Sequence, residues 1–183
     1  MVKPFKKKAV YEDLYSIPEN TKGQIIDGDL WALPRAGGHH SLAIANLTVR
    51  LSTAFPRDPK GWVFLSDVEL RVGKHLLVPD LCGWRRERMP EVPNINVFEL
   101  APDWVCEVFS PSTAFLDKGR KREIFAEAGV KHVWFVDPAT QTIDVLERHG
   151  KRYEVATSVG STGVAKLVPF ESYELDLTKF WAR

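Results

Sequence analysis

Two acids in apolar segments are the residues of this chain best suited to chemistry. Glu107 interrupts the apolar run 104–109, and Asp80 follows a second apolar run at 76–79. A carboxylate inside an apolar strand is costly unless it is paired with a cation, protonated or bound to a metal. Both acids are therefore candidates for a functional site.

A pair of carboxylates on neighbouring strands can hold a divalent cation. Magnesium takes oxygen ligands, usually one or two carboxylates completed by substrate and water. The bound cation polarises a phosphate and lowers the pKa of an attacking water, which is what phosphodiester hydrolysis needs. In this interpretation Asp80 and Glu107 are ligands at one end of a sheet. From spacing alone the plainer interpretation is favoured, in which both are strand-end acids that are hydrated or paired with basic residues.

A lysine follows the two acids on an expected helix. Lys121 lies four residues after Asp117, so the two side chains share one helix face. Spacing alone favours an ordinary surface salt bridge. In the functional interpretation Lys121 leans over the metal site, where its long stem and localised charge position the attacking water. Asp117 would then orient Lys121 or the helix.

Other polar residues are supporting candidates. His40 stands at an expected helix start and could shuttle a proton or touch phosphate, although a polar helix start is its simpler role. Asp29, on an expected hairpin, could be a third acid or could only solvate a strand. Basic residues at 85–86 and 118–122 could hold a phosphate backbone, although a charge run on a helix is usually a solvated face. The sequence has no GxSxG, Walker or Rossmann glycine pattern, which argues against serine hydrolases and nucleotide-binding folds.

The elements that must position these residues include both helices and strands. Apolar spacing and the breakers that follow it predict helices at 9–17, from 39 or 40 to 55, and at 117–128. Strands are predicted at 62–72, 76–84, 103–109 and 132–136, with hairpins around Asp27-Gly28 and His149-Gly150. The segment 175–181 is expected to close the chain as a short helix or strand. This order predicts an α/β or α+β fold, with helices on the faces of a sheet.

Size and composition limit the class of protein. With 183 residues and 44% apolar residues, the chain is expected to form one domain over 1–183. The balance of 25 basic and 24 acidic residues indicates no global basic field, so a patch that binds nucleic acid must be local. Cys82 and Cys106 lie in apolar runs and are expected to be buried free thiols. No apolar run approaches the roughly 20 residues of a membrane span, and the lysines at 3 and 6–8 precede no signal-peptide core, so a cytoplasmic protein is expected.

Several stretches also match a known family in order along almost the whole chain. They are residues 26–30, 34–40, 78–81, 102–113, 117–121, 128–130 and 133–138. The most specific is a Glu-Val-x-Ser-Pro-Ser-Thr block starting at Glu107, followed by an Asp-x-x-x-Lys helix. On these motifs the chain resembles the Uma family of "putative restriction endonucleases", within the PD-(D/E)xK nuclease superfamily.

The resemblance implies a restriction-endonuclease-like fold, a mixed central sheet flanked by helices. It implies Asp80 and Glu107 as ligands of Mg²⁺, with Mn²⁺ as a possible substitute, and a nucleic-acid substrate, expected to be double-stranded DNA. In the usual superfamily motif the lysine lies two residues after the second acid, where this chain has Phe109. Similar families move the lysine to the following helix, and Lys121 fits that place. Because two DNA strands need two sites, a homodimer is expected.

The chain departs from the family pattern in its first hairpin. The family commonly has Tyr-Glu-Leu-Ile-Asp-Gly-Glu-Leu there, whereas this chain has Gln24 in place of the first acid and Asp29 in place of the second. If the first acid helps to bind metal, its absence would weaken a second metal site or the activity. His40 matches the family's histidine better than His39. Two alternatives to a nuclease therefore remain: an inactive nuclease-fold module that binds nucleic acid or a protein, and a structural homodimer subunit.

Overall fold

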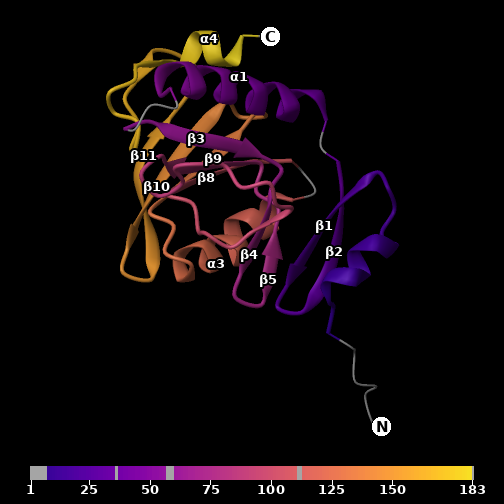
Figure 1. Ribbon diagram of the computed structural model, residues 1–183. Coiled ribbons are helices and arrows are strands. Elements are labelled where there is room, and N and C mark those ends of the chain that lie inside the picture. The colour runs from indigo at the N-terminus through magenta and orange to yellow at the C-terminus, as the bar shows by residue number, and fades with distance from the viewer. Residues whose placement is uncertain (1–7, 36, 57–59, 111–112, 183) are drawn as a thin grey trace.

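A six-stranded mixed sheet carries the strand of Glu107 at the centre of the molecule (Figure 1). The computed structural model describes residues 8–35, 37–56, 60–110 and 113–182. The strand order is β11-β10-β9-β8-β6-β3, and only β8 and β9 are parallel among these neighbours. The strands are β3 (Trp62–Ser66), β6 (Leu81–Arg85), β8 (Trp104–Val108), β9 (His132–Asp137), β10 (Thr142–His149) and β11 (Arg152–Val159).

A second sheet has the order β2-β1-β5-β4-β7 and is built mainly from hairpins. Its strands are β1 (Thr21–Ile26), β2 (Asp29–Pro34), β4 (Glu69–Val72), β5 (His75–Leu77) and β7 (Val97–Phe98). Asp27 and Gly28 connect β1 to β2 with φ of 55° and 84°, which is the positive φ that a tight primed turn needs. The predicted Asp-Gly hairpin is therefore confirmed. A separate two-stranded pair joins β12 (Val164–Ala165) to β13 (Leu175–Asp176).

Helices lie on both faces of the central sheet (Figure 1). On one face lie α1 (Gly38–Ala54) and α4 (Leu177–Trp181), and on the other lie α2 (Ala114–Leu116), η2 (Asp117–Lys121) and α3 (Arg122–Glu127). A short 3-10 helix, η1 (Tyr11–Ser16), packs near β1. The second sheet shares the α3 face, because Leu70 and Leu77 of that sheet belong to the same buried cluster as Ile124 and Phe125.

The side chains of β8 divide between two buried clusters, as the alternation of a strand requires. Trp104, Cys106 and Val108 join the cluster under α1 and α4. Val105 and Phe109 join the cluster under α3 and the second sheet. Glu107 shares the second face by position, so its carboxylate lies on the side of the helix that carries Lys121.

The structure confirms most of the predicted elements and corrects some of them. The predicted strand 76–84 is wrong as one element, because β5 and β6 belong to different sheets with Pro79 between them. Proline has no N–H to donate to a ladder, which favours a break at that point. The predicted strand 62–72 is likewise two strands, divided near Asp67, whose φ is 52°. The predicted helix 117–128 is kinked at Gly119, which has non-helical φ and ψ.

Other expectations concern the cysteines, the turn after β8 and the N-terminus. Cys82 and Cys106 are free and buried, as predicted. The Ser-Pro-Ser-Thr turn falls partly on residues 111–112, and the first lysines fall within 1–7, which both lie outside the described residues. No helix among the described ranges is long and apolar enough to cross a membrane.

Candidate active site

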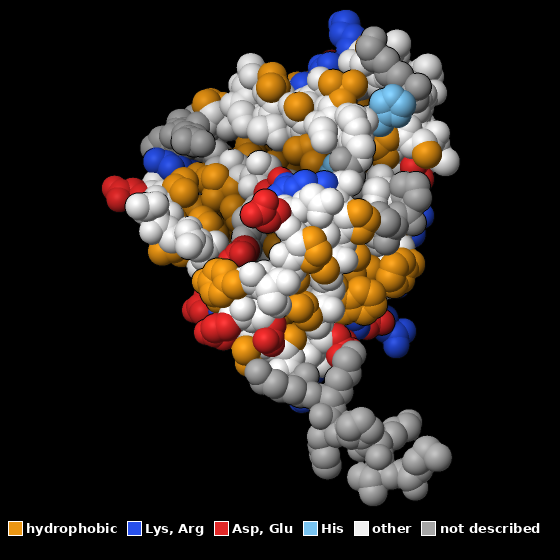
Figure 2. Space-filling model, turned by 90° about the vertical axis from the view of Figure 1, so that its right-hand side faces the viewer, with side chains coloured by type: hydrophobic (Ala, Val, Ile, Leu, Met, Phe, Trp, Pro, Cys, Tyr) orange, Lys and Arg blue, Asp and Glu red, His pale blue; other side chains and the backbone are white. Residues whose placement is uncertain are grey.

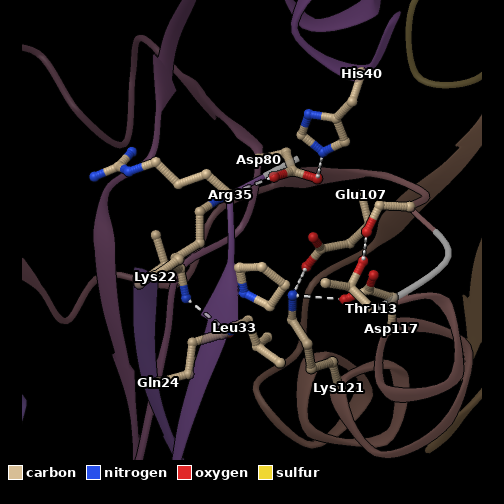
Figure 3. A pocket seen from close by; sticks show the side chains of 13 residues that line it. Lys22, Gln24, Leu33, Arg35, His40, Asp80, Glu107, Thr113, Asp117 and Lys121 are labelled. Carbon is tan, nitrogen blue, oxygen red and sulfur yellow. Dashed lines mark hydrogen bonds and ion pairs between the residues drawn. The ribbon is translucent and has the colours of Figure 1, made fainter. Parts of the chain in front are cut away.

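Asp80, directly before β6, lies next to Glu107 on the neighbouring strand β8. Leu81 pairs with Cys106 in antiparallel register, so Asp80, one residue earlier, stands across from Glu107, one residue later. Opposite residues of an antiparallel pair project to the same face, with Cβ atoms roughly 5 Å apart. Figure 3 shows both carboxylates reaching into one pocket together with His40 and Lys121. The pocket is lined by Lys22, Gln24, Leu33, Pro34, Arg35, His40, Val78, Asp80, Glu107, Ser110, Thr113, Asp117 and Lys121.

Asp80 is held by donors on both carboxylate oxygens. The Val108 N–H donates to Oδ2 at 2.8 Å, and His40 Nε2 lies 3.2 Å from the same oxygen. Lys22 Nζ donates to Oδ1 at 3.0 Å. Burial alone would raise the pKa of Asp80, but the His40 hydrogen bond and the Lys22 charge outweigh it and hold the pKa well below its usual range. Asp80 is therefore an anion at neutral pH.

Glu107 is almost fully buried and has an oxygen without a hydrogen-bond partner. Its side chain is 2% exposed, and Oε1 lies 2.6 Å from Lys121 Nζ. This contact is an ion pair, and among the described residues Oε1 has no further hydrogen-bond partner. Burial raises the pKa of Glu107 to about 8, against the opposing effect of Lys121 and with the support of Asp117 and Asp80.

Lys121 is a buried cation between two acids. Its side chain is 2% exposed, and Nζ donates to Asp117 Oδ1 at 2.9 Å. Burial would lower the pKa of Lys121, but Glu107 and then Asp117 outweigh it and raise the pKa above the usual value. The surface salt bridge that spacing favoured for Asp117 and Lys121 is wrong, because the following helix packs this face onto β8 and encloses the pair. Sequence spacing does not encode that packing.

The first hairpin contributes two further polar side chains to the pocket. Lys22 and Gln24 are two residues apart on β1, so they share one face of the strand. Lys22 Nζ contacts Asp67 at 2.7 Å as well as Asp80. Burial would lower the pKa of Lys22, but Asp80 and Asp67 raise it overall. Gln24 is 1% exposed, and its Oε1 accepts from the Val78 N–H at 3.0 Å.

The donor set fits a magnesium ion that keeps much of its shell as water or substrate. The part of the chain that the structure describes holds no group of three or more His, Cys, Asp or Glu arranged for a metal. Magnesium needs only one or two protein carboxylates, and Asp80 and Glu107 supply two from one face. Oε1 of Glu107 is buried and, within the described ranges, engages the Lys121 ammonium at 2.6 Å, so a bound cation would share or compete for this oxygen. The cavity of about 40 Å³ has room for an ion together with water.

A comparison with models of protein families identifies the family of this chain. A family model described as "Putative restriction endonuclease" matches residues 9–178. The chain belongs to the Uma2 family. The resemblance that the sequence motifs indicated is confirmed.

A solved structure shares the fold of this Uma2 chain. It is described as "a putative nuclease belonging to DUF820" from Anabaena variabilis. The two chains are 22% identical, the match covers 93% of this chain and 96% of the other, and the TM-score is 0.74. The mixed α+β architecture is thus that of a nuclease-like fold. A search of curated proteins found no match.

The Uma2 pocket brings together most of the site residues predicted from the sequence. Asp80, Glu107, Lys121, His40 and Asp117 all line it. Asp29 does not line it, because this residue begins β2 with an exposed side chain. The pocket lies between the hairpin β1–β2, the N-terminus of α1, the segment before β6, and the stretch from β8 to η2, so distant parts of the chain supply it (Figure 3).

Lys22 is the main pocket residue that sequence reasoning missed. The alternation of side chains along a strand could have indicated Lys22. It lies two residues before Gln24, which aligns with a family acid, and so points to the same face of β1. Two of the basic residues expected to hold phosphate make contacts within the chain. Arg85 lies over the Trp62 ring at 4.4 Å, and Arg120 pairs with Asp27 at 2.7 Å. On the face shown in Figure 2, basic side chains are scattered among acidic and hydrophobic ones.

Proposed function

We propose that this chain is a metal-dependent endonuclease that hydrolyses phosphodiester bonds in DNA. The observation that supports the proposal best is the convergence of Asp80 and Glu107 in one pocket, with the buried ammonium of Lys121 2.6 Å from Glu107. Two carboxylates and a lysine in one pocket match the needs of phosphoryl chemistry. Membership of a family described as putative restriction endonucleases supports the same reaction class.

Each pocket residue has a role that its contacts support. Asp80 and Glu107 would hold Mg²⁺, or Mn²⁺ in its place, which would polarise the phosphate and acidify a bound water. Lys121 positions the attacking water and offsets charge on the scissile phosphate. Asp117 orients Lys121 through the 2.9 Å hydrogen bond. His40 and the Val108 N–H fix the orientation of Asp80.

The proposed substrate is double-stranded DNA, and the proposed active form is a homodimer of single-domain chains. A duplex has two strands, so two sites related by two-fold symmetry would cut both. Light scattering on the purified protein, with and without a duplex, measures the oligomeric state. A monomer under both conditions would overturn this part of the proposal without affecting the chemistry of the pocket.

A plasmid-nicking assay with a matched pair of variants tests the proposed activity. Supercoiled plasmid is incubated with the wild-type protein in Mg²⁺, Mn²⁺ or EDTA. Asp80→Asn keeps the size of the side chain and removes the anion, so cleavage should fall by a factor of about 10² or more, comparable to the loss of one preorganised group that stabilises a transition state. Asp144→Asn, on β10 beside Ser158 and outside the pocket, is the control and should cleave like the wild type. Equal cleavage by Asp80→Asn would overturn the assignment.

A second candidate is a nuclease-fold module that binds nucleic acid or a protein without cleaving. The observation that favours it is the set of partners on Asp80, where Lys22, His40 and Val108 together engage both oxygens. Fluorescence anisotropy with a labelled duplex separates the two functions. Binding in EDTA and in Mg²⁺ with no cleavage in either would favour the module, whereas metal-dependent nicking would exclude it.

A further inference from the structure

Lys22 is a cation built into the pocket beside one of the two proposed metal ligands. Its Nζ lies 3.0 Å from Asp80 Oδ1 and 2.7 Å from Asp67 Oδ1. Asp67 is 57% exposed and belongs to the turn between β3 and β4, outside the pocket. Asp67 therefore holds Lys22 from outside the pocket. The ammonium of Lys22 contacts Oδ1 of Asp80, whereas His40 and the Val108 N–H contact Oδ2.

Gln24 lies on the same face of β1 as Lys22, at the position where the family commonly has an acid. Its Oε1 accepts from the Val78 N–H, so the amide nitrogen is its remaining polar end. An amide nitrogen is a donor and does not ligate a cation. The strand β1 therefore offers the pocket one ammonium group and one neutral amide, and neither attracts a second metal ion.

The charges of the side chains in the pocket favour the binding of a single divalent cation. Three carboxylates, those of Asp80, Glu107 and Asp117, face the ammonium groups of Lys22 and Lys121. Figure 3 shows the guanidinium of Arg35 pointing away from these acids. When all three acids are ionised, as cation binding requires of Asp80 and Glu107, they exceed the two ammonium groups by one charge, so one divalent cation leaves the group singly positive, which suits an incoming phosphate. A second cation would add a further double charge to the same group of side chains and make it strongly positive.

We propose that Lys22 is an internal counter-ion that takes the place of a second divalent cation beside Asp80, so that each chain binds one metal ion. This inference rests on the proposed function, since it assumes that Asp80 and Glu107 bind metal. In this scheme Lys22 competes with the metal for Asp80 and sets its affinity, and Asp67 acts only by drawing Lys22 away from Asp80.

Titration calorimetry with MnCl₂ and MgCl₂ measures both the number of ions and their affinity without relying on activity. The wild type should bind one ion. Lys22→Met keeps most of the apolar stem and removes the charge, so the single ion should bind at least about tenfold more tightly. Lys22→Met combined with Gln24→Glu should bind two ions. Lys166→Met, which removes an exposed lysine paired with Glu174 on the surface, is the control and should behave like the wild type.

A double-mutant cycle tests whether Asp67 acts through Lys22. Asp67→Asn alone should weaken the affinity for the ion by a few fold, because Lys22 then interacts with Asp80 alone. In the Lys22→Met background the same change should have almost no effect. An equal effect in both backgrounds would overturn the competition between Lys22 and the metal. This cycle also applies if Lys22→Met folds poorly, because Lys22→Gln can replace it as the neutral background.

The outcomes separate this inference from the function on which it rests. Two ions in the wild type, or unchanged affinity in Lys22→Met, would overturn the role of Lys22 and leave the metal site intact. No binding of either ion by any variant, with all variants folded by circular dichroism, would overturn the proposed metal site itself.

Discussion

The Nζ of Lys121 lies 2.6 Å from Oε1 of Glu107, and both side chains are 2% exposed. Asp117 completes the group at 2.9 Å from the same nitrogen. A buried ammonium is stable only while an acid beside it carries a compensating charge. The ion pair with Glu107 therefore links η2 to the central sheet through the proposed catalytic lysine. The same contacts fix the position of Lys121 and of the helix that carries it.

Removing the charge of Lys121 should destabilise the fold strongly. Lys121→Met leaves Glu107 and Asp117 buried without their cation, and we expect a loss of about 3–5 kcal/mol in the free energy of unfolding. Urea denaturation followed by circular dichroism measures it. The control Lys166→Met should change stability by no more than about 0.5 kcal/mol. A loss below about 1 kcal/mol for Lys121→Met would show that the group does not carry charge in the folded state.

Metal ions should stabilise the wild type through Glu107. At a free ion concentration of about 100 Kd, binding adds about 2.7 kcal/mol, which raises Tm by roughly 5–10 °C for a chain of this size. Glu107→Gln removes the anion with little change in shape, so it should abolish the rise in Tm on adding Mn²⁺. Differential scanning fluorimetry measures the shift. If Mn²⁺ raised the Tm of Glu107→Gln as much as that of the wild type, the ion would bind at a site that does not include Glu107.

The pKa of Glu107 should make stability depend on pH in metal-free buffer. Burial raises this pKa from 4.5 to about 8, so the folded state holds a proton that the unfolded state releases above pH 4.5. The stabilising contribution of that proton is full below about pH 4.5 and is lost as pH rises through about 8. Urea denaturation at several values from pH 5 to 9 should therefore show a decline that is smaller in Glu107→Gln. Parallel pH profiles of the two proteins would contradict a protonated Glu107.

The same proton should oppose metal binding. Because an ion requires the carboxylate form, affinity should increase with pH up to about 8 and level off above it. Calorimetry in buffers of different ionisation enthalpy counts the protons that binding releases. We expect close to one proton per ion at pH 7, and no dependence on the buffer would contradict this linkage.

The two thiols should be inert in the native protein. Cys82 and Cys106 are fully buried, and burial raises the pKa of each well above its usual value, so little thiolate forms. Ellman's reagent should react slowly in native buffer and promptly with both thiols in denaturant. Fast reaction of one thiol in native buffer would show that the sheet opens near β6 or β8.

Parts of the fold follow from local sequence rules. The Asp27-Gly28 turn, the helix that contains His40 and the buried strand 132–136 were all predictable, because turn chemistry and apolar periodicity act over a few residues. The division of 76–84 into β5 and β6 was not. Pro79 is compatible with a break in this apolar run, but the sheet that each half joins depends on pairing with distant strands, which a single segment does not record.

The sequence by itself determined which residues have the chemistry, and the tertiary structure decided how they meet. The motifs indicated Asp80, Glu107 and Lys121 as a set, and the alternation of β8 assigned Glu107 to the face away from Cys106. Only the folded chain placed Lys22 of the first hairpin against Asp80 and enclosed Asp117 and Lys121 as a buried pair. Spacing reports which side chains share a face of one element, but burial and long-range ion pairs depend on what packs against that face.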